Sequence, residues 1–153
     1  MAPPTLEELV YSAAQRALDQ QSTALSDLRT RTSTLVAAAT LSASFLGAAA
    51  ISRSAPAWAA VLAMAAFLLT GAFAGAVLWS ARVLFALDAD RVEEELFPYR
   101  EDPAAYFLEA AHGLHNAYVE NERVIERREL VFRLALLALG AETVLWALAL
   151  ALS

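Results

Sequence analysis

Several residue types that organise small proteins are missing or scarce in this chain of 153 residues. Cysteine is absent, which excludes disulfides, thiolate metal sites and cysteine nucleophiles. Lysine is absent too, so all eleven basic side chains are arginines. Only five glycines and five prolines are available to interrupt a helix. The formal charge of −6 argues against nucleic acid as a partner, because neutralising phosphates takes clustered basic side chains.

Charge is also absent from long stretches of the chain. Residues 32–52 and 54–81 carry no charged side chain, and residues 134–153 contain only Glu142. About 20 apolar residues are enough to cross a bilayer as a helix. The hydrophobic share of 59% also exceeds the roughly 45–50% of soluble domains. We therefore predict an all-α integral membrane protein with three transmembrane helices.

The limits of the apolar stretches define the expected spans. Residues 34–52 and 57–80 form a transmembrane hairpin over 34–80, and residues 134–153 form the third transmembrane helix. Trp58 and Trp79 flank the second span, as aromatic side chains do at membrane interfaces. Arg53 and Pro56 lie in the short connection, which is a tight turn between antiparallel helices.

The arginines set the expected orientation, because cytoplasmic loops are enriched in basic residues. Ten of the eleven lie before the first span or between the second and third, and only Arg53 lies on the opposite side. This places the amino terminus and residues 81–133 in the cytoplasm and the carboxyl terminus outside. The absence of lysine and the abundance of alanine suggest a GC-rich bacterial genome, hence a multi-pass protein of the bacterial inner membrane. More than thirty residues precede the first span, which predicts a retained anchor rather than a cleaved signal peptide.

The remaining segments predict cytoplasmic helices that form a stalk. Residues 1–33 read as an amphipathic helix that opens with a capping box, Thr5 followed by Glu8. Asp102 before Pro103 marks the start of a second long helix after a loop at 98–103. The helix of the second span is expected to continue beyond Ser80. Apolar stripes on these helices must be buried against one another or against other copies.

Glu142 is the strongest single candidate for a functional residue. A charged group near the membrane midplane costs about 2.5–3.5 kcal/mol on insertion scales, so such a residue is retained only for a reason. Ser42, Thr70 and Gly71 lie at the same depth on the other spans. A role in a pore or ion path and a role as a neutral carboxyl that joins helices both remain open.

Gly71 and Gly75 form one small-xxx-small pair, and Ala43 and Gly47 form another. Both pairs fit packing within the hairpin or an oligomer seam.

A basic collar lies where the third span enters the membrane. It consists of Arg123, Arg127, Arg128 and Arg133, and its favoured role is attraction to anionic lipid headgroups, with a phosphate site as the alternative. Interleaved glutamates are expected to pair with many of these arginines.

The sequence gives little support for metal binding or for catalysis. Glu109, His112 and His115 resemble half of a carboxylate–histidine metal site, but no third histidine exists to complete it. The acidic residues between 88 and 95 are expected to form a solvated face. We expect no metal, no cofactor and no enzymatic activity, because no catalytic grouping or nucleotide loop is present.

The order of segments along the chain also resembles that of a known group of membrane proteins. A polar helix ending in Arg29, Thr30, Arg31 and Thr32 precedes a hairpin of two spans, an acidic segment and a helix with Asn121 that enters the last span. This order resembles the small transmembrane effectors of bacterial anti-phage signalling, notably the Pycsar type and the SLATT group. The resemblance implies an oligomer that perturbs the inner membrane when a cytoplasmic nucleotide signal or protein partner arrives. The chain departs from these effectors in having no separable ligand-binding domain.

Two functions follow as expectations. The first is an oligomeric inner-membrane effector or pore whose stalk receives a signal, with membrane lipid and other copies of the chain as partners. The second is a non-conducting scaffold or accessory subunit that docks a cytoplasmic protein. A small transporter is disfavoured, because the chain lacks the inverted repeats and broken helices of such proteins.

Overall fold

The protein is all-helical in a computed structural model that describes residues 3–79, 83, 96–99 and 101–153. Its elements are α1 (Leu6–Ser52), α2 (Ala57–Leu78), the short 3-10 helix η1 (Phe97–Tyr99) and α4 (Pro103–Ala151). Helix accounts for 90% of the described residues, and none of them is in a strand. The helices α1, α2 and α4 are each long and apolar enough to cross a membrane. The prediction of an all-α chain with three such helices is confirmed.

The chain forms two compact units. The polar unit comprises Met1–Ser26 and Ala81–Glu126, and the apolar unit comprises Asp27–Ser80 and Arg127–Ser153. The helices α1 and α4 each contribute residues to both units, because neither helix is interrupted. The acidic segment between 88 and 95, and with it Arg82 and Arg91, lies outside the described residues.

Both long helices start at the caps that the sequence predicts. At α1 the Thr5 backbone N–H donates to Glu8 Oε2 at 3.0 Å, and the Glu8 N–H donates to Thr5 Oγ1 at 3.3 Å. At α4 the N–H groups of Ala104 and Ala105 donate to Asp102 Oδ1 at 3.1 and 3.2 Å. These bonds satisfy backbone donors that have no partner within the first turn of a helix. The capping box and the Asp102 cap are therefore confirmed.

The turn between α1 and α2 closes the hairpin of the apolar unit. The Ala55 N–H donates to Ala50 O at 3.0 Å, and the Ser54 N–H donates to Ile51 O at 3.2 Å. This pair of bonds is a Schellman motif, in which the residue after the helix cap adopts a left-handed conformation. That residue is Ser54, with φ of 56°, and Pro56 then leads into α2. The tight turn that the sequence predicts is therefore present.

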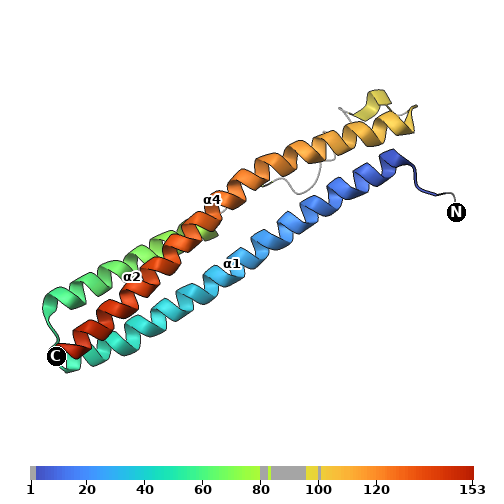
Figure 1. Cartoon of the computed structure of the whole chain (residues 1–153). Coiled ribbons are helices and arrows are strands. Elements are labelled where there is room, and N and C mark those ends of the chain that lie inside the picture. The colour runs from blue at the N-terminus through green and yellow to red at the C-terminus, as the bar shows by residue number, and fades with distance from the viewer. Residues whose placement is uncertain (1–2, 80–82, 84–95, 100) are drawn as a thin grey trace. The chain divides into compact units, whose positions relative to one another are not determined.

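In the apolar unit α2 lies beside the adjoining parts of α1 and α4 (Figure 1), and small side chains form the core cluster between these helices. Their core cluster contains four alanines and one large residue, Trp146, all at most 3% exposed. The alanines, Ala50, Ala59, Ala63 and Ala149, let the helix backbones come close. Trp146 lies against Gly47, where an added Cβ would be only 3.3 Å from two atoms of the indole ring. The core cluster of this unit thus consists of alanines around one tryptophan.

The helix α2 ends earlier than the sequence suggests. Its last helical residue is Leu78, and Trp79 has an extended backbone with φ of −56° and ψ of 136°. The helical continuation expected beyond Ser80 falls on residues that, apart from Val83 and Leu96, lie outside the described residues. The Trp79 carbonyl accepts a hydrogen bond from Arg128 Nη2 at 2.6 Å.

The polar unit is a pairing of α1 with α4. Leu18, Leu25 and Leu114 are buried, and the rings of Tyr11 and Phe107 contact at a centroid distance of 5.6 Å. Gln21 Nε2 also donates to the Tyr118 carbonyl at 3.0 Å. The apolar stripe on each helix is therefore buried in part against the other helix within this unit, whereas Leu6 and Leu9 at the start of α1 stay exposed.

Candidate functional site

Glu142 is buried inside the apolar unit, with no exposed surface. Both of its carboxylate oxygens lack a hydrogen-bond partner in the described part of the chain. Trp146 lies one turn further along α4, and its buried indole N–H interacts with the Glu142 carboxyl, although this contact does not meet hydrogen-bond geometry. A buried polar group that makes no hydrogen bond costs about 1–3 kcal/mol. Such groups are rare in folded proteins and each calls for an explanation.

The level of Glu142 on α1 follows from the contact between Gly47 and Trp146. Both helices run in the same direction through this unit, so Glu142, four residues before Trp146, and Ser42, five residues before Gly47, lie on the same side of this contact. The Ser42 hydroxyl is also buried without a partner.

On α2, Ala63 belongs to the same core cluster as Trp146 and Ala149. The helix α2 runs opposite to α4, so Thr70, seven residues after Ala63, lies on the same side of that cluster as Glu142. Thr70 has no exposed surface, and its hydroxyl donates to Ala66 O at 3.0 Å. Glu142, Ser42 and Thr70 are thus buried polar groups on α4, α1 and α2 that lie on the same side of the core cluster, and we call these three residues the polar layer.

The glycine pair on α2 lies outside this layer. No described atom lies within 4 Å of a Cβ added at Gly71 or Gly75, whereas Gly47 on α1 is in close contact with Trp146. The close approach of helices within the chain thus occurs at Gly47 and not at the Gly71–Gly75 pair. Of the two roles that the sequence leaves open for this pair, packing within the hairpin has no contact to support it.

Arg128 differs from the rest of the basic collar, because it is only 7% exposed. Its Nη2 donates to the Trp79 carbonyl, and its Nη1 is buried without a partner. Burial is the main cause that lowers the pKa of Arg128 from the usual arginine value, and the nearby charge of Arg29 adds to it. The guanidinium stays protonated. A positive charge at the carboxyl end of a helix is favourable, so Arg128 caps α2.

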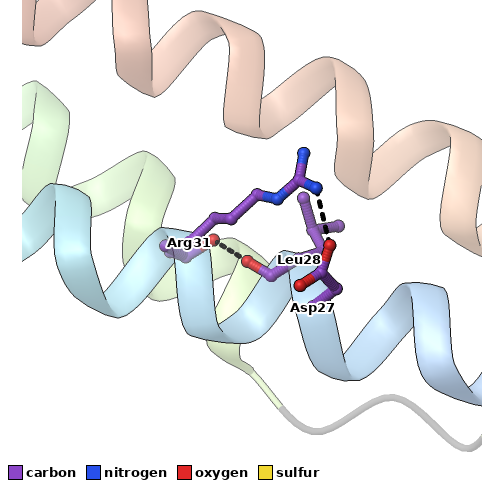
Figure 2. A network of polar contacts seen from close by, with 4 residues as sticks. Asp27, Leu28 and Arg31 are labelled. Atoms are coloured by element: carbon purple, nitrogen blue, oxygen red, sulfur yellow. Dashed lines mark hydrogen bonds and ion pairs between the residues drawn. The ribbon is translucent and has the colours of Figure 1, made fainter.

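The other arginines of the collar are exposed. Arg133 Nη2 pairs with Glu129 Oε1 at 2.8 Å, one turn away on α4. Arg123 and Arg127 make no ion pair within the described residues. On α1, Arg31 reaches back to Asp27 at 2.6 Å (Figure 2). The side chains free to meet a lipid headgroup or a phosphate are therefore Arg123 and Arg127.

A seven-residue spacing links the buried polar residues of α4. Asn121, Arg128 and Glu142 are buried, as are Ala135 and Ala149 at the other positions of the series. A seven-residue repeat of buried positions is the pattern of helices that pack side by side, and polar residues within it fix the register at a cost in stability. The sequence analysis names Arg128 only as one of four collar arginines and Asn121 only as part of the segment order, whereas this spacing groups both residues with Glu142 as buried positions.

The histidines show no metal site. His112 Nδ1 lies 3.9 Å from Glu109 Oε2, and both side chains are largely exposed. No group of three or more histidine, aspartate or glutamate side chains that could hold a metal occurs among the described residues. Comparison of the chain with protein-family models, curated proteins and solved structures found no match. What the chain does is therefore inferred from the polar layer and its surroundings.

Proposed function

We propose that this protein is an oligomeric effector of the bacterial inner membrane, which perturbs membrane integrity when its cytoplasmic part receives a signal. The proposal rests on Glu142, a carboxyl group that is fully buried among three apolar helices with no hydrogen-bond partner there. Anti-phage defence is the process that the resemblance of the segment order suggests.

An unsatisfied carboxyl argues for a bundle that changes state. A packing that only had to be stable would gain about 1–3 kcal/mol from an apolar residue at this position, because the penalty of the unpaired oxygens would disappear. Glu142 therefore destabilises the packed arrangement relative to any arrangement in which its carboxyl meets water or a donor. A pore or a hydrated defect supplies such a partner, which favours the effector over a static membrane anchor.

The long helices offer a route by which a signal reaches this group. The helices α1 and α4 each run without interruption from the polar unit into the apolar unit. A shift of either helix at its amino-terminal end is transmitted along its backbone, since helices move as rigid elements over short displacements.

The test is membrane depolarisation in cells that express the chain. Wild-type expression together with phage infection is expected to depolarise the cells. The Glu142→Leu variant is expected to suppress this effect, because removal of the unpaired carboxyl stabilises the packed bundle and shifts its opening equilibrium about 5- to 150-fold. A membrane-potential dye measures the fraction of depolarised cells.

Thr143→Val is the matched control, since Thr143 is the next residue on α4 and its side chain is exposed. It removes a polar group from the same depth without touching the polar layer, and it should depolarise cells as the wild type does. The proposal is wrong if wild-type expression never depolarises infected cells, or if Thr143→Val suppresses the effect as strongly as Glu142→Leu.

A second candidate is a non-conducting scaffold that docks a partner protein. It is favoured by apolar side chains of the polar unit that remain exposed, among them Leu6, Leu9 and Leu108 at 45–72%. Exposed apolar patches of this kind mark interaction sites. Purification in mild detergent separates the two functions: a homogeneous ring supports the effector, whereas a monomer that carries a different protein supports the scaffold.

A further inference from the structure

A hollow lies between α1 and α4 within the polar unit. It has a volume of about 270 Å³, and its walls combine apolar residues, Ala17, Ala24 and Ile125, with polar residues from both helices. All of its lining residues belong to the polar unit, so it is separate from the polar layer around Glu142. Its chemistry indicates what kind of group would fill it.

Gln21 provides the first indication. This side chain lines the hollow and is only 8% exposed. Its Nε2 is committed to the Tyr118 carbonyl at 3.0 Å, which fixes the orientation of the amide. Its Oε1 is buried and accepts no hydrogen bond from the described residues. An acceptor in this situation needs a donor, since leaving it unpaired costs free energy.

The charge of the hollow provides the second indication. Glu122 and Glu126 line it from α4, one helical turn apart on the same face. Like charges at this spacing repel each other by about 0.2–0.5 kcal/mol. Neither carboxylate forms an ion pair within the described residues, and no arginine or histidine is among the residues that line the hollow. The hollow thus gathers acceptors and negative charge.

We propose that this hollow binds the ammonium or guanidinium group of a small organic cation. Such a group supplies N–H donors for Gln21 Oε1 and positive charge for Glu122 and Glu126. The apolar wall of Ala17, Ala24 and Ile125 suits a short aliphatic stem attached to that group. The proposal does not depend on the membrane activity proposed above, and its failure would leave that activity untouched.

Agmatine is a suitable probe, because it carries an ammonium and a guanidinium group on one aliphatic stem. Titration calorimetry of the full chain in mild detergent, at about 0.15 M salt to screen exposed charges, should show saturable binding. Tetramethylammonium has the same charge as an ammonium group but no N–H donor, and it should bind at least about tenfold more weakly. Equal binding of the two probes would overturn the proposal, as would the absence of saturable agmatine binding up to about 10 mM.

Substitutions of residues that line the hollow test whether agmatine binds there. The double variant Glu122→Gln with Glu126→Gln should weaken agmatine binding at least about tenfold, because two charge-assisted contacts are lost. Gln21→Leu should weaken it about fivefold or more through loss of one acceptor. The control Glu120→Gln removes the same charge from an exposed residue that does not line the hollow, and it should change affinity less than about twofold.

A loss of affinity in Glu120→Gln as large as in the double variant would show that agmatine is only a counterion, and the proposal would be wrong. Helix content and elution volume check that each variant folds, and the comparison of the two probes on the wild-type chain needs no variant.

The same chemistry could reach the hollow from a free amine or from an arginine side chain of another polypeptide. Agmatine binding with no change in molecular mass supports the free amine. Agmatine binding that releases a second polypeptide, seen as a fall in mass by light scattering, supports the arginine side chain.

Discussion

Gly47 is the position at which a single substitution tests the packing of the apolar unit. A Cβ added there would lie 3.3 Å from atoms Cη2 and Cζ2 of Trp146, tighter than ordinary van der Waals contact. Leucine would add three further carbons in the same space. Overpacking of this kind costs about 1–3 kcal/mol, and we expect Gly47→Leu to lower the free energy of unfolding by about 3 kcal/mol.

Gly71→Leu is the matched control. No described atom lies within 4 Å of a Cβ at Gly71, so the larger side chain meets no resistance within the chain. Both variants replace glycine by leucine inside a helix, so the gain in helix propensity is common to both and cancels in the comparison. We expect Gly71→Leu to be at least about 2 kcal/mol more stable than Gly47→Leu.

The assay is equilibrium unfolding of the purified protein by SDS in mild detergent, followed by tryptophan fluorescence. A double-mutant cycle adds Trp146→Ala, which removes the ring that the new side chain would strike. In that background Gly47→Leu should cost less than half of its original penalty, a coupling of more than about 1 kcal/mol. Equal stabilities of Gly47→Leu and Gly71→Leu, or no coupling to Trp146, would refute the packing described here.

Three further predictions concern helix ends and can be measured by the same unfolding assay. Ser54→Gly should stabilise the hairpin by about 1 kcal/mol, because glycine adopts the left-handed conformation without the strain of a side chain. Arg128→Leu should destabilise the apolar unit by about 2 kcal/mol, since the Trp79 carbonyl loses a charge-assisted hydrogen bond; a stable variant would show that Arg128 does not cap α2. Asp102→Ala should cost about 1 kcal/mol through loss of the cap of α4, whereas Glu101→Ala, one residue earlier, should leave that cap intact.

The features that sequence reasoning predicted correctly are local ones. The capping box joins Thr5 to Glu8 and the second cap joins Asp102 to its next two residues, so each is visible within a few positions of the chain. The apolar stretches predict spanning helices because helix length and bilayer thickness are both known. The turn near Pro56 is predictable because the chain must reverse between two such stretches.

The features that it missed depend on distant partners. Arg128 caps a backbone carbonyl 49 positions earlier, so its sequence neighbours suggest only one more exposed arginine. The small-xxx-small pair of Ala43 and Gly47 indicates a close approach of helices, but it does not identify Trp146 as the residue packed against Gly47. A small-residue pair such as Gly71 and Gly75 satisfies the motif, but the motif does not say which helix face meets a neighbour. The seven-residue spacing of Asn121, Arg128 and Glu142 is the one sequence feature named above that indicates which face of α4 is buried.

The most direct test of the central claim uses the absence of cysteine, because any introduced cysteine is the only thiol in the chain. Ser12→Cys and Ser153→Cys are labelled in intact spheroplasts with a membrane-impermeant maleimide, before and after permeabilisation. Three membrane crossings with the arginine-rich side in the cytoplasm predict that the thiol at 153 reacts in intact cells and the thiol at 12 reacts only after permeabilisation. Reaction of both thiols in intact cells, or of the thiol at 12 alone, would contradict the account.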